Sequence, residues 1–354
     1  MSPLKNKISV LLHTSNRPDF LERVLSYLSR SEELRQLPIF LLEGSDDPHW
    51  PQAQKVAGQF PSLGITVVHR PRSVPFQERM LAGAEQCSTP YVLLAADDDF
   101  YLPGWLPDAV AQLDTEPNLS AVYGHNLFFE LEAYETAGRL IEYFVPRRRV
   151  PSAVWVEQEL PEQRIAAVSR GLHEPATPSW YSLQRVEAVR DSCRIAIEAG
   201  AKQDYLEYLH FFCQLALGKV RMMDRIVLAR QVNWDARHML PPPAVAARQI
   251  DRVVPYCAKY LETVAGIAPA DASRISRDFF AGILSESRRS HSTAIKIRTA
   301  IGRIPAVAKA RERLRSNPQK FADGYPDPRF PPIPAVEDDD PIVQLIRRET
   351  APRP

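Results

Sequence analysis

The acidic triplet Asp97-Asp98-Asp99 is the part of the sequence with the clearest chemical potential. It directly follows YVLLAA (91–96), an apolar run typical of a strand that is buried on both faces. Open α/β sheets bind ligands at the carboxyl ends of such strands. Adjacent carboxylates raise one another's pKa unless a cation compensates, and Mg²⁺ or Mn²⁺ held by one or two carboxylates and substrate phosphates would do so. A solvated acidic turn is the purely structural alternative.

The elements that must position this triplet alternate along the first 125 residues, as a parallel sheet with crossover helices requires. We expect strands at 8–12, 39–43, 65–69, 91–96 and 119–124, with helices around 18–28, 51–59 and 75–87. Hairpins are predicted up to Phe144. Further on, we expect a short strand and a helix within 180–199, a helix over 203–219, and strands at 220–223 and 226–232. The predicted fold class is therefore α/β, with a mostly parallel central sheet flanked by helices.

Length and composition limit the kind of protein this is. The chain has 354 residues, and 44 Lys and Arg nearly balance 43 Asp and Glu, which argues against a surface that coats nucleic acid. Four cysteines are spaced neither as a metal motif nor as a disulfide framework, so reduced thiols are expected. The sequence shows no signal peptide and no apolar stretch of transmembrane length, which predicts a cytoplasmic protein or one that is peripheral at the inner face of a membrane.

Charge and proline content divide the chain into three predicted regions. We expect residues 1–240 to form the α/β domain, 241–316 a helical C-terminal region that begins at a Pro triplet, and 317–354 a Pro-rich extended tail. Within the second region, 285–316 carries nine basic and two acidic side chains interleaved with apolar residues. A basic amphipathic helix of this type binds anionic membrane surfaces, or packs its apolar stripe on the enzyme with a solvated basic face. Nothing that resembles a nucleic-acid-binding module accompanies the charge.

Three consecutive segments resemble the family 2 type of bacterial glycosyltransferase. They are ISVLLHTSNRPDFLERVLSYL, LPIFLLEGSD and SVPFQERMLAGAEQCSTPYVLLAADDDFYLPGWL, which together cover about residues 6–130. The resemblance implies a GT-A fold, a nucleotide-diphosphate-sugar donor bound through a divalent metal (Mn²⁺ or Mg²⁺), and inverting transfer of the sugar to an acceptor hydroxyl. A glycan, a lipid-linked molecule or another hydroxyl compound would be the acceptor, in cell-surface polysaccharide or glycoconjugate synthesis.

Two turns of this pattern are expected to hold the nucleotide. Thr14, Asn16 and Arg17 follow the first strand, where a turn that opens a helix offers backbone N–H groups and polar side chains. Glu43 ends the second strand where the resemblance implies an acidic residue that contacts the base or ribose, with Asp46 as the alternative. Each of these residues also has an ordinary structural interpretation as a turn or helix-end residue.

The alignment of the acidic triplet with the family's D-x-D motif has two registers. A gap-free overlay places Ala96 at the first acidic position and leaves Asp98 and Asp99 as the last two, whereas a literal reading of Asp97-x-Asp99 requires a shift of one residue. In both registers we expect Asp99 to bind the metal, with Asp97 and Asp98 sharing ribose contact and metal support. Arg79 falls near the Arg of the family's Arg-Asn pair and is expected to contact the nucleotide-sugar.

Acceptor activation requires a general base. The resemblance implies a Glu-Asp pair that opens a helix, and QDYLEYL offers Asp204 as the base, with Glu207 on nearly the same face as the alternative. A helix-capping Asp is the structural interpretation of the same position. Trp180 and Tyr181 lie in the region that shapes the acceptor pocket in such enzymes, although a core role suits them as well.

His238 is the one histidine that the resemblance implicates. It lies in RQVNWDARHML and matches the family's late Arg-His segment, where it would complete the metal or diphosphate site; a surface position is the alternative. Two other functions remain open. A sugar nucleotidyltransferase would have a Gly-rich phosphate loop after the first strand, where this chain has HTSNRP. A degenerate GT-A-fold binding or scaffold protein is the other alternative.

Overall fold

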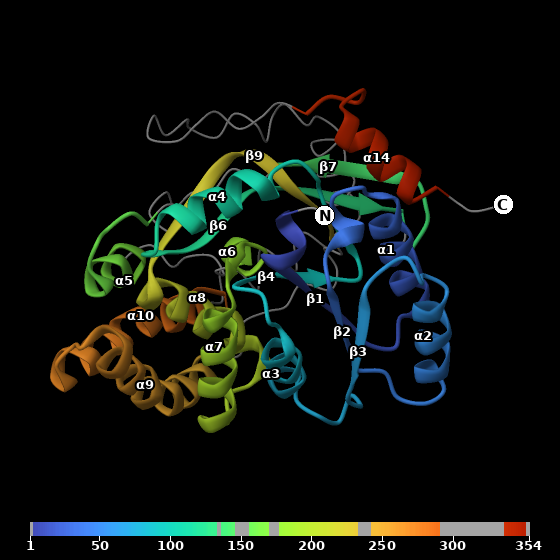
Figure 1. Cartoon of the computed structure of the whole chain (residues 1–354). Helices are drawn as coiled ribbons and strands as arrows, with labels where there is room; N and C mark the ends of the chain where they lie inside the picture. The colour runs from blue at the N-terminus through green and yellow to red at the C-terminus, as the bar shows by residue number, and fades with distance from the viewer. Residues whose placement is uncertain are drawn as a thin grey trace, which may run out of the picture.

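The computed structural model describes residues 3–132, 136–145, 156–169, 177–232, 242–290 and 336–351. Its centre is a nine-stranded mixed sheet in the order β3-β2-β1-β4-β8-β6-β9-β5, with β7 paired to β6 (Figure 1). The strands are β1 (Ile8–Thr14), β2 (Ile39–Glu43), β3 (Ile65–His69), β4 (Tyr91–Ala96), β5 (Asp99–Tyr101), β6 (Leu119–Leu131), β7 (Leu140–Phe144), β8 (Leu183–Arg185) and β9 (Lys219–Gln231).

Parallel pairing of β1 with its two neighbours brings the carboxyl ends of three strands together. Thr14 at the end of β1 is in register with Glu43 at the end of β2, and His13 is in register with Ala96 at the end of β4. The acidic triplet therefore emerges beside the two turns that the sequence assigns to the nucleotide. The three-residue strand β8 runs antiparallel to both β4 and β6 and joins this parallel half to the rest of the sheet.

Helices cover both faces of the sheet. α1 and α2 pack side by side along one face, and α3 and α7 pack together on the other, as right-handed crossovers dictate (Figure 1). α9 and α10 form an antiparallel pair against α7, α8 and α5. The helices that match the sequence prediction and those that follow are η1 (Pro3–Asn6), α1 (Pro18–Arg30), η2 (Leu34–Gln36), α2 (His49–Gly58), α3 (Phe76–Gln86), α4 (Leu106–Thr115), α5 (Pro161–Ser169), α6 (Thr177–Trp180), α7 (Val186–Glu198), η4 (Gln203–Tyr205), α8 (Leu206–Leu217), α9 (Pro243–Ala265), α10 (Pro269–Ser290) and α14 (Pro341–Glu349).

Two predicted elements differ from the observed ones. The strands expected at 220–223 and 226–232 form one strand, β9, because shifts in its register with β6 let it continue through Asp224. The tail predicted to be extended over 317–354 contains α14, which is initiated by an Asp340 side-chain cap and buries Val343 and Ile346. Residues 233–241, which include the predicted domain boundary, and residues 291–335, which include most of the basic segment, lie outside the described part of the chain.

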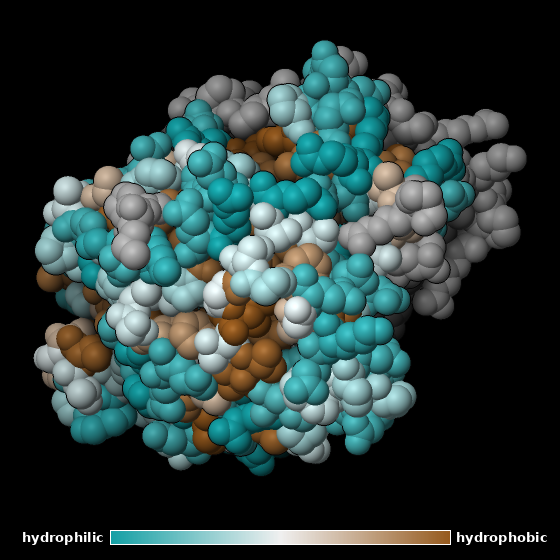
Figure 2. Space-filling model, turned by 45° about the vertical axis from the view of Figure 1, so that its right-hand side comes forward, coloured by the Kyte–Doolittle hydropathy of each residue, from teal (hydrophilic) through white to brown (hydrophobic). Residues whose placement is uncertain are grey.

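The apolar residues of the described part are gathered in one continuous core on both sides of the sheet. The face shown in Figure 2 is mostly hydrophilic, with a small group of hydrophobic side chains near its centre. All four cysteines are buried and free, which agrees with the expectation of reduced thiols. Within the described ranges, each helix is too short or too polar to cross a membrane.

Candidate active site

The acidic triplet is split between two structural elements. β4 ends at Ala96, Asp97 and Asp98 form a turn, and Asp99 begins β5, which pairs antiparallel with β9. This split gives the three carboxylates different directions and different exposures: the side chains of Asp97 and Asp99 are 3% and 2% exposed, and that of Asp98 is 14% exposed. Asp98 is therefore the carboxylate of the triplet that is most open to a ligand.

Each carboxylate of the triplet has its own partners. Thr14 Oγ1 donates to Asp97 Oδ2 at 2.6 Å. The Arg17 guanidinium lies 3.2 Å from Asp97 Oδ1 and 3.0 Å from Asp98 Oδ2, so one cation bridges two of the acids. Asp99 Oδ1 accepts from the backbone N–H of Gln231 at 3.2 Å, which ties it to β9. The predicted residues Thr14 and Arg17 thus do lie at the triplet.

Arg23, which the sequence did not single out, holds the backbone of the acidic turn from beneath. Its guanidinium donates to the carbonyl oxygen of Asp98 at 3.2 Å, to Gln231 Oε1 at 2.7 Å and to the carbonyl oxygen of Thr136 at 3.0 Å. The residue is 3% exposed. It lies on the buried side of α1. The helix that follows the first nucleotide turn therefore also fixes the position of the acidic turn.

Burial makes two carboxylates of the triplet harder to ionise, and the nearby arginines only partly compensate. Burial and the Asp98 charge raise the pKa of Asp97 to about 7, although Arg17 opposes this shift. Burial and the same charge raise the pKa of Asp99 well above its usual value, against the opposing effect of Arg230. Asp99 Oδ2 is buried and makes no hydrogen bond to the described residues. An additional cation at this turn would relieve both conditions.

The oxygen donors of the triplet fit a hard divalent ion, but they do not form a complete site on their own. Among the described residues, no group of three or more His, Cys, Asp or Glu side chains converges as a metal site would require. A divalent ion held here would take one or two protein carboxylates and complete its shell with substrate phosphates and water. His238, predicted as a further ligand, lies outside the described residues.

A second polar cluster surrounds Glu43 at the end of β2. Both carboxylate oxygens of Glu43 accept from the backbone N–H of Ser45, at 3.0 and 3.1 Å, and His69 Nε2 lies 3.6 Å from Oε2. Burial raises the pKa of Glu43, while Ser45, His69 and Arg79 oppose that effect. The Arg79 guanidinium lies directly over Gly44, so a Cβ added to that glycine would overlap its Nη1. Glu43 and Arg79 therefore belong to one cluster of charged groups.

Asn16 connects the two nucleotide turns. It adopts a left-handed backbone conformation with φ of 56°, which Asn tolerates better than most residues. Its N–H donates to Ser45 Oγ at 2.7 Å, and its Oδ1 accepts from the N–H of Asp46 at 3.0 Å. The Asp46 carboxylate is exposed and accepts from the backbone N–H of Arg72 at 3.1 Å, so both acidic candidates lie at this turn.

His13, near the carboxyl end of β1, is a residue that the sequence did not single out. It stands one position before the end of β1 and packs edge-on against Phe76, with ring centroids 5.3 Å apart. Its Nδ1 is buried and has no hydrogen-bond partner among the described residues. Burial lowers its pKa to about 4, Arg17 and two other arginines add to this effect, and Asp98 opposes it. A histidine near the end of an otherwise apolar strand was the available signal.

The two candidate bases differ in their surroundings. Asp204 is exposed within η4, and its negative charge adds to the effect of burial in raising the pKa of Tyr205. Glu207 lies in the first turn of α8, and its negative charge contributes to raising the pKa of both Tyr181 and Arg230. Since Arg230 Nε is 3.9 Å from Asp99 Oδ2, Glu207 faces the same group of charges as the acidic triplet.

The two residues predicted for the acceptor pocket are both largely buried, at 4% and 5% exposure for Trp180 and Tyr181. Trp180 packs edge-on against the core residue His210, so it has the structural role that the sequence also allowed. The Tyr181 ring lies 4.8 Å from the Arg230 guanidinium. Burial raises the pKa of Asp99, and the Tyr181 hydroxyl opposes this shift. Tyr181 therefore supports the acidic triplet, whereas Trp180 supports the helix behind it.

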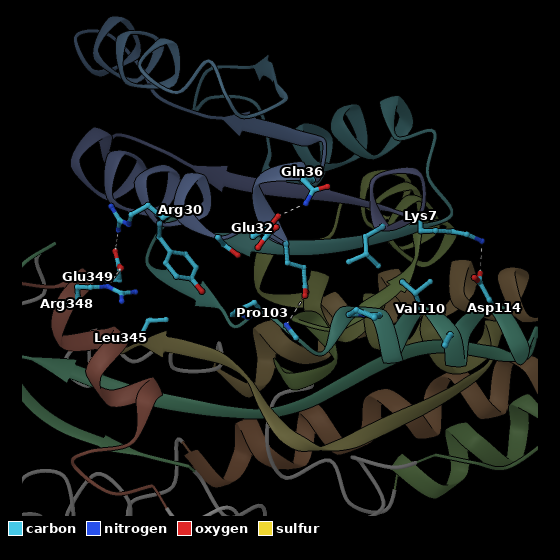
Figure 3. A pocket seen from close by; sticks show the side chains of 17 residues that line it. Lys7, Arg30, Glu32, Gln36, Pro103, Val110, Asp114, Leu345, Arg348 and Glu349 are labelled. Atoms are coloured by element: carbon cyan, nitrogen blue, oxygen red, sulfur yellow. Dashed lines mark hydrogen bonds and ion pairs between the residues drawn. The ribbon is translucent and has the colours of Figure 1, made fainter. Parts of the chain in front are cut away.

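A separate cavity of about 840 Å³ contains none of the predicted site residues. It lies between the C-terminal end of α1, the start of α4 and helix α14 (Figure 3). Glu33 beside it accepts from the N–H of Gly104 at 3.0 Å, and Glu349 binds both Arg30 and Arg348 at its edge. The cavity is thus formed where the C-terminal helix closes over the sheet domain.

Comparison with known proteins defines the class. The model of glycosyl transferase family 2 matches residues 9–191, which is more than half of the chain and includes both polar clusters. The chain therefore belongs to glycosyl transferase family 2, and it is a glycosyltransferase. This membership favours a transferase over the nucleotidyltransferase and the scaffold that the sequence also allowed. A search of curated proteins finds no match.

Solved structures show the same fold. The crystal structure of S. aureus TarS 1-349 in complex with UDP has a TM-score of 0.54 and 15% identity, and it covers 97% of this chain and 88% of that chain. The same TarS fragment in complex with UDP-GlcNAc has a TM-score of 0.54 and 14% identity over the same shares. Both are GT-A glycosyltransferase folds with a helical C-terminal region, which confirms the predicted fold class for this chain.

Proposed function

We propose that the protein transfers a sugar from a uridine-diphosphate-sugar donor to an acceptor hydroxyl, with a divalent metal and with inversion. The observation that carries the proposal is that a buried carboxylate–arginine pocket and a partly exposed acidic turn lie at one edge of the sheet of a family 2 glycosyltransferase. The nucleotides in the TarS complexes support the choice of uridine.

The two polar clusters suit the two ends of such a donor. Glu43 is fully buried, so we assign it to the base end as the group that holds the Ser45 turn in place, with the Arg79 guanidinium beside it as a donor. Asp98, at the other end, is partly exposed beside Arg17. We assign the first metal contact to Asp98 in place of Asp99, because the Asp99 carboxylate is buried and is directed toward β9. When bound, the metal neutralises charge on the leaving diphosphate.

Arg17 and Arg230 would also neutralise negative charge on the leaving diphosphate. Arg17 already bridges Asp97 and Asp98, so a diphosphate that approaches the turn meets a guanidinium that is held in place. Arg230 lies 26% exposed between Asp99 and Tyr181. Both cations stabilise negative charge that develops as the glycosidic bond to the diphosphate breaks.

For the general base we favour Glu207 over Asp204. A base must reach the acceptor oxygen while that oxygen approaches the sugar carbon opposite the leaving group. Glu207 shares an electrostatic environment with Arg230 and Tyr181, next to the acidic triplet, whereas Asp204 is exposed on η4. The carboxylate of Glu207 would take the acceptor proton as the new glycosidic bond forms.

The donor is tested by calorimetric titration of UDP-GlcNAc, UDP-glucose, GDP-mannose and dTDP-glucose with and without Mn²⁺. We expect a UDP-sugar to bind, and to bind more tightly with Mn²⁺ in the wild type than in Asp98→Asn. Binding of none of the four nucleotide sugars would contradict the proposed function. Metal enhancement that survives Asp98→Asn but is lost in Asp99→Asn would restore the original metal assignment.

The base is tested by donor hydrolysis or transfer measured in Glu207→Gln and Asp204→Asn. Loss of a general base typically lowers kcat by about 10²- to 10⁴-fold. We expect that loss in Glu207→Gln, with donor affinity unchanged, and a change of less than about threefold in Asp204→Asn. The reverse pattern would show that the family-based assignment of Asp204 is correct.

We also propose that the segment 285–316 brings the enzyme to the cytoplasmic face of an anionic membrane, where a lipid-linked acceptor would be found. Its nine basic and two acidic side chains support this role. Flotation with vesicles of phosphatidylglycerol and phosphatidylcholine tests it against neutral vesicles. Replacement of Lys296, Arg298 and Arg303 by Gln should reduce recovery with the anionic vesicles. Equal recovery of the wild type and the variant would favour packing of the segment on the enzyme.

A further inference from the structure

His13 occupies a position between the two polar clusters. Leu11 and Leu42 both face Gly83 of α3, where a Cβ added to the glycine would meet the Cδ2 atoms of both leucines. His13 is two residues beyond Leu11 and in register with Leu42, so it lies on the same face of the sheet, beneath the first turn of α3. The edge-on contact with Phe76 fixes the ring there.

Charges from both ends of the proposed donor site act on this ring. Arg79 belongs to the pocket around Glu43, while Asp98 and Arg17 belong to the acidic turn, and all three influence His13. In a nucleotide diphosphate, the ribose lies between the base and the phosphates. If the base binds at Glu43 and the diphosphate binds at Asp98, the imidazole therefore lies at the level of the ribose.

One nitrogen of the His13 ring has no hydrogen-bond partner among the described residues. Nδ1 is buried and unpartnered within the described ranges, and a buried polar atom without a partner is costly. Burial and the surrounding arginines keep the imidazole neutral, so one ring nitrogen donates and the other accepts. A phosphate oxygen can only accept, whereas a hydroxyl both donates and accepts and thus matches either tautomer.

We propose that His13 is a donor-binding residue that hydrogen-bonds a ribose hydroxyl of the nucleotide. This inference rests on the proposed function. It concerns a residue whose side chain is placed for this contact by β1 and Phe76, and it adds a specificity determinant to a pocket whose charged members recognise the base and the diphosphate.

The test measures the affinity of UDP, 2′-deoxy-UDP and 3′-deoxy-UDP, with Mn²⁺, for the wild type, His13→Leu and His13→Asn. A neutral hydrogen bond corresponds to about a threefold to tenfold change in affinity. We expect the wild type to bind one of the deoxy analogues that much more weakly than UDP. His13→Leu should bind UDP and that analogue equally, and His13→Asn should restore part of the difference.

Glu43→Gln serves as the matched control, because a change at the base end should weaken all three nucleotides by the same factor. Discrimination that persists in His13→Leu would overturn the proposal, and so would equal weakening of all three nucleotides, which indicates packing or a diphosphate contact. Absence of discrimination in the wild type overturns it without any variant. If UDP does not bind the wild type at all, the proposed function fails together with this inference.

Discussion

Replacement of Arg23 by Met should destabilise the protein more than any change at an exposed arginine. The substitution removes three hydrogen bonds, to the carbonyl oxygens of Asp98 and Thr136 and to Gln231 Oε1, and leaves these acceptors in a site where the arginine is only 3% exposed. It also removes a positive charge that lies near all three acids of the triplet. Hydrogen bonds to charged groups contribute about 1.5–3 kcal/mol each, but they are not additive.

A buried acceptor that loses its partner costs about 1–3 kcal/mol, and because three acceptors are affected we expect Arg23→Met to lower the free energy of unfolding by about 3–5 kcal/mol. In urea, with an m-value of about 3 kcal/mol/M, the midpoint should fall by about 1–2 M. Arg35→Met, an exposed position on η2, is the control and should change the free energy by less than about 0.5 kcal/mol. An unfolding midpoint of Arg23→Met equal to that of the control would refute the reasoning.

Other predictions concern the base pocket, the core and the C-terminal helix. Gly44→Ala should weaken UDP binding about tenfold or more with little loss of stability, because the new methyl group must displace the flexible end of the Arg79 side chain. Calorimetry measures the affinity and thermal denaturation measures the stability. An unchanged affinity for UDP would contradict the contact between Gly44 and Arg79. Burial lowers the pKa of His210 to about 3 from an unfolded value near 6.5, so protons bind preferentially to the unfolded chain below about pH 6.5. Stability should therefore fall by up to about 1.4 kcal/mol per pH unit from this residue as the pH drops toward 3, and His210→Gln should flatten that slope in urea titrations. Ile346→Ala should lower the free energy of unfolding by about 2–5 kcal/mol in the main transition, whereas a helix that docks independently of the domain would leave that transition unchanged.

The first half of the fold could be predicted because its signals are local. β2, β3 and β4 have the predicted bounds, since short apolar runs bounded by turns define buried strands, and the helices between them follow their apolar periodicity. β8 and the continuous β9 were less visible, because three residues carry little pattern and because the polar centre of β9, around Asp224, resembles a turn.

The sequence predicts those site residues that belong to short local motifs, but not those that only the fold brings together. Thr14, Arg17 and the acidic triplet belong to recognisable turns, and the structure places them together. The role of Arg23 depends on Gln231, which lies 208 positions away, and no pattern within α1 announces that contact. The role proposed for His13 likewise depends on which face of the sheet receives α3.

Helix α14 makes the integrity of the sheet domain depend on a late part of the chain. Its residue Leu345 lines the cavity opposite Tyr27 and Val110, and its residue Glu349 binds Arg30 of α1. All described residues of the proposed donor site lie before residue 233. During synthesis, the strands and helices of that site can therefore assemble while one wall is still missing. A product that stops before Pro341 would carry a donor site but expose the apolar lining of that cavity, a state that cellular quality control is suited to detect.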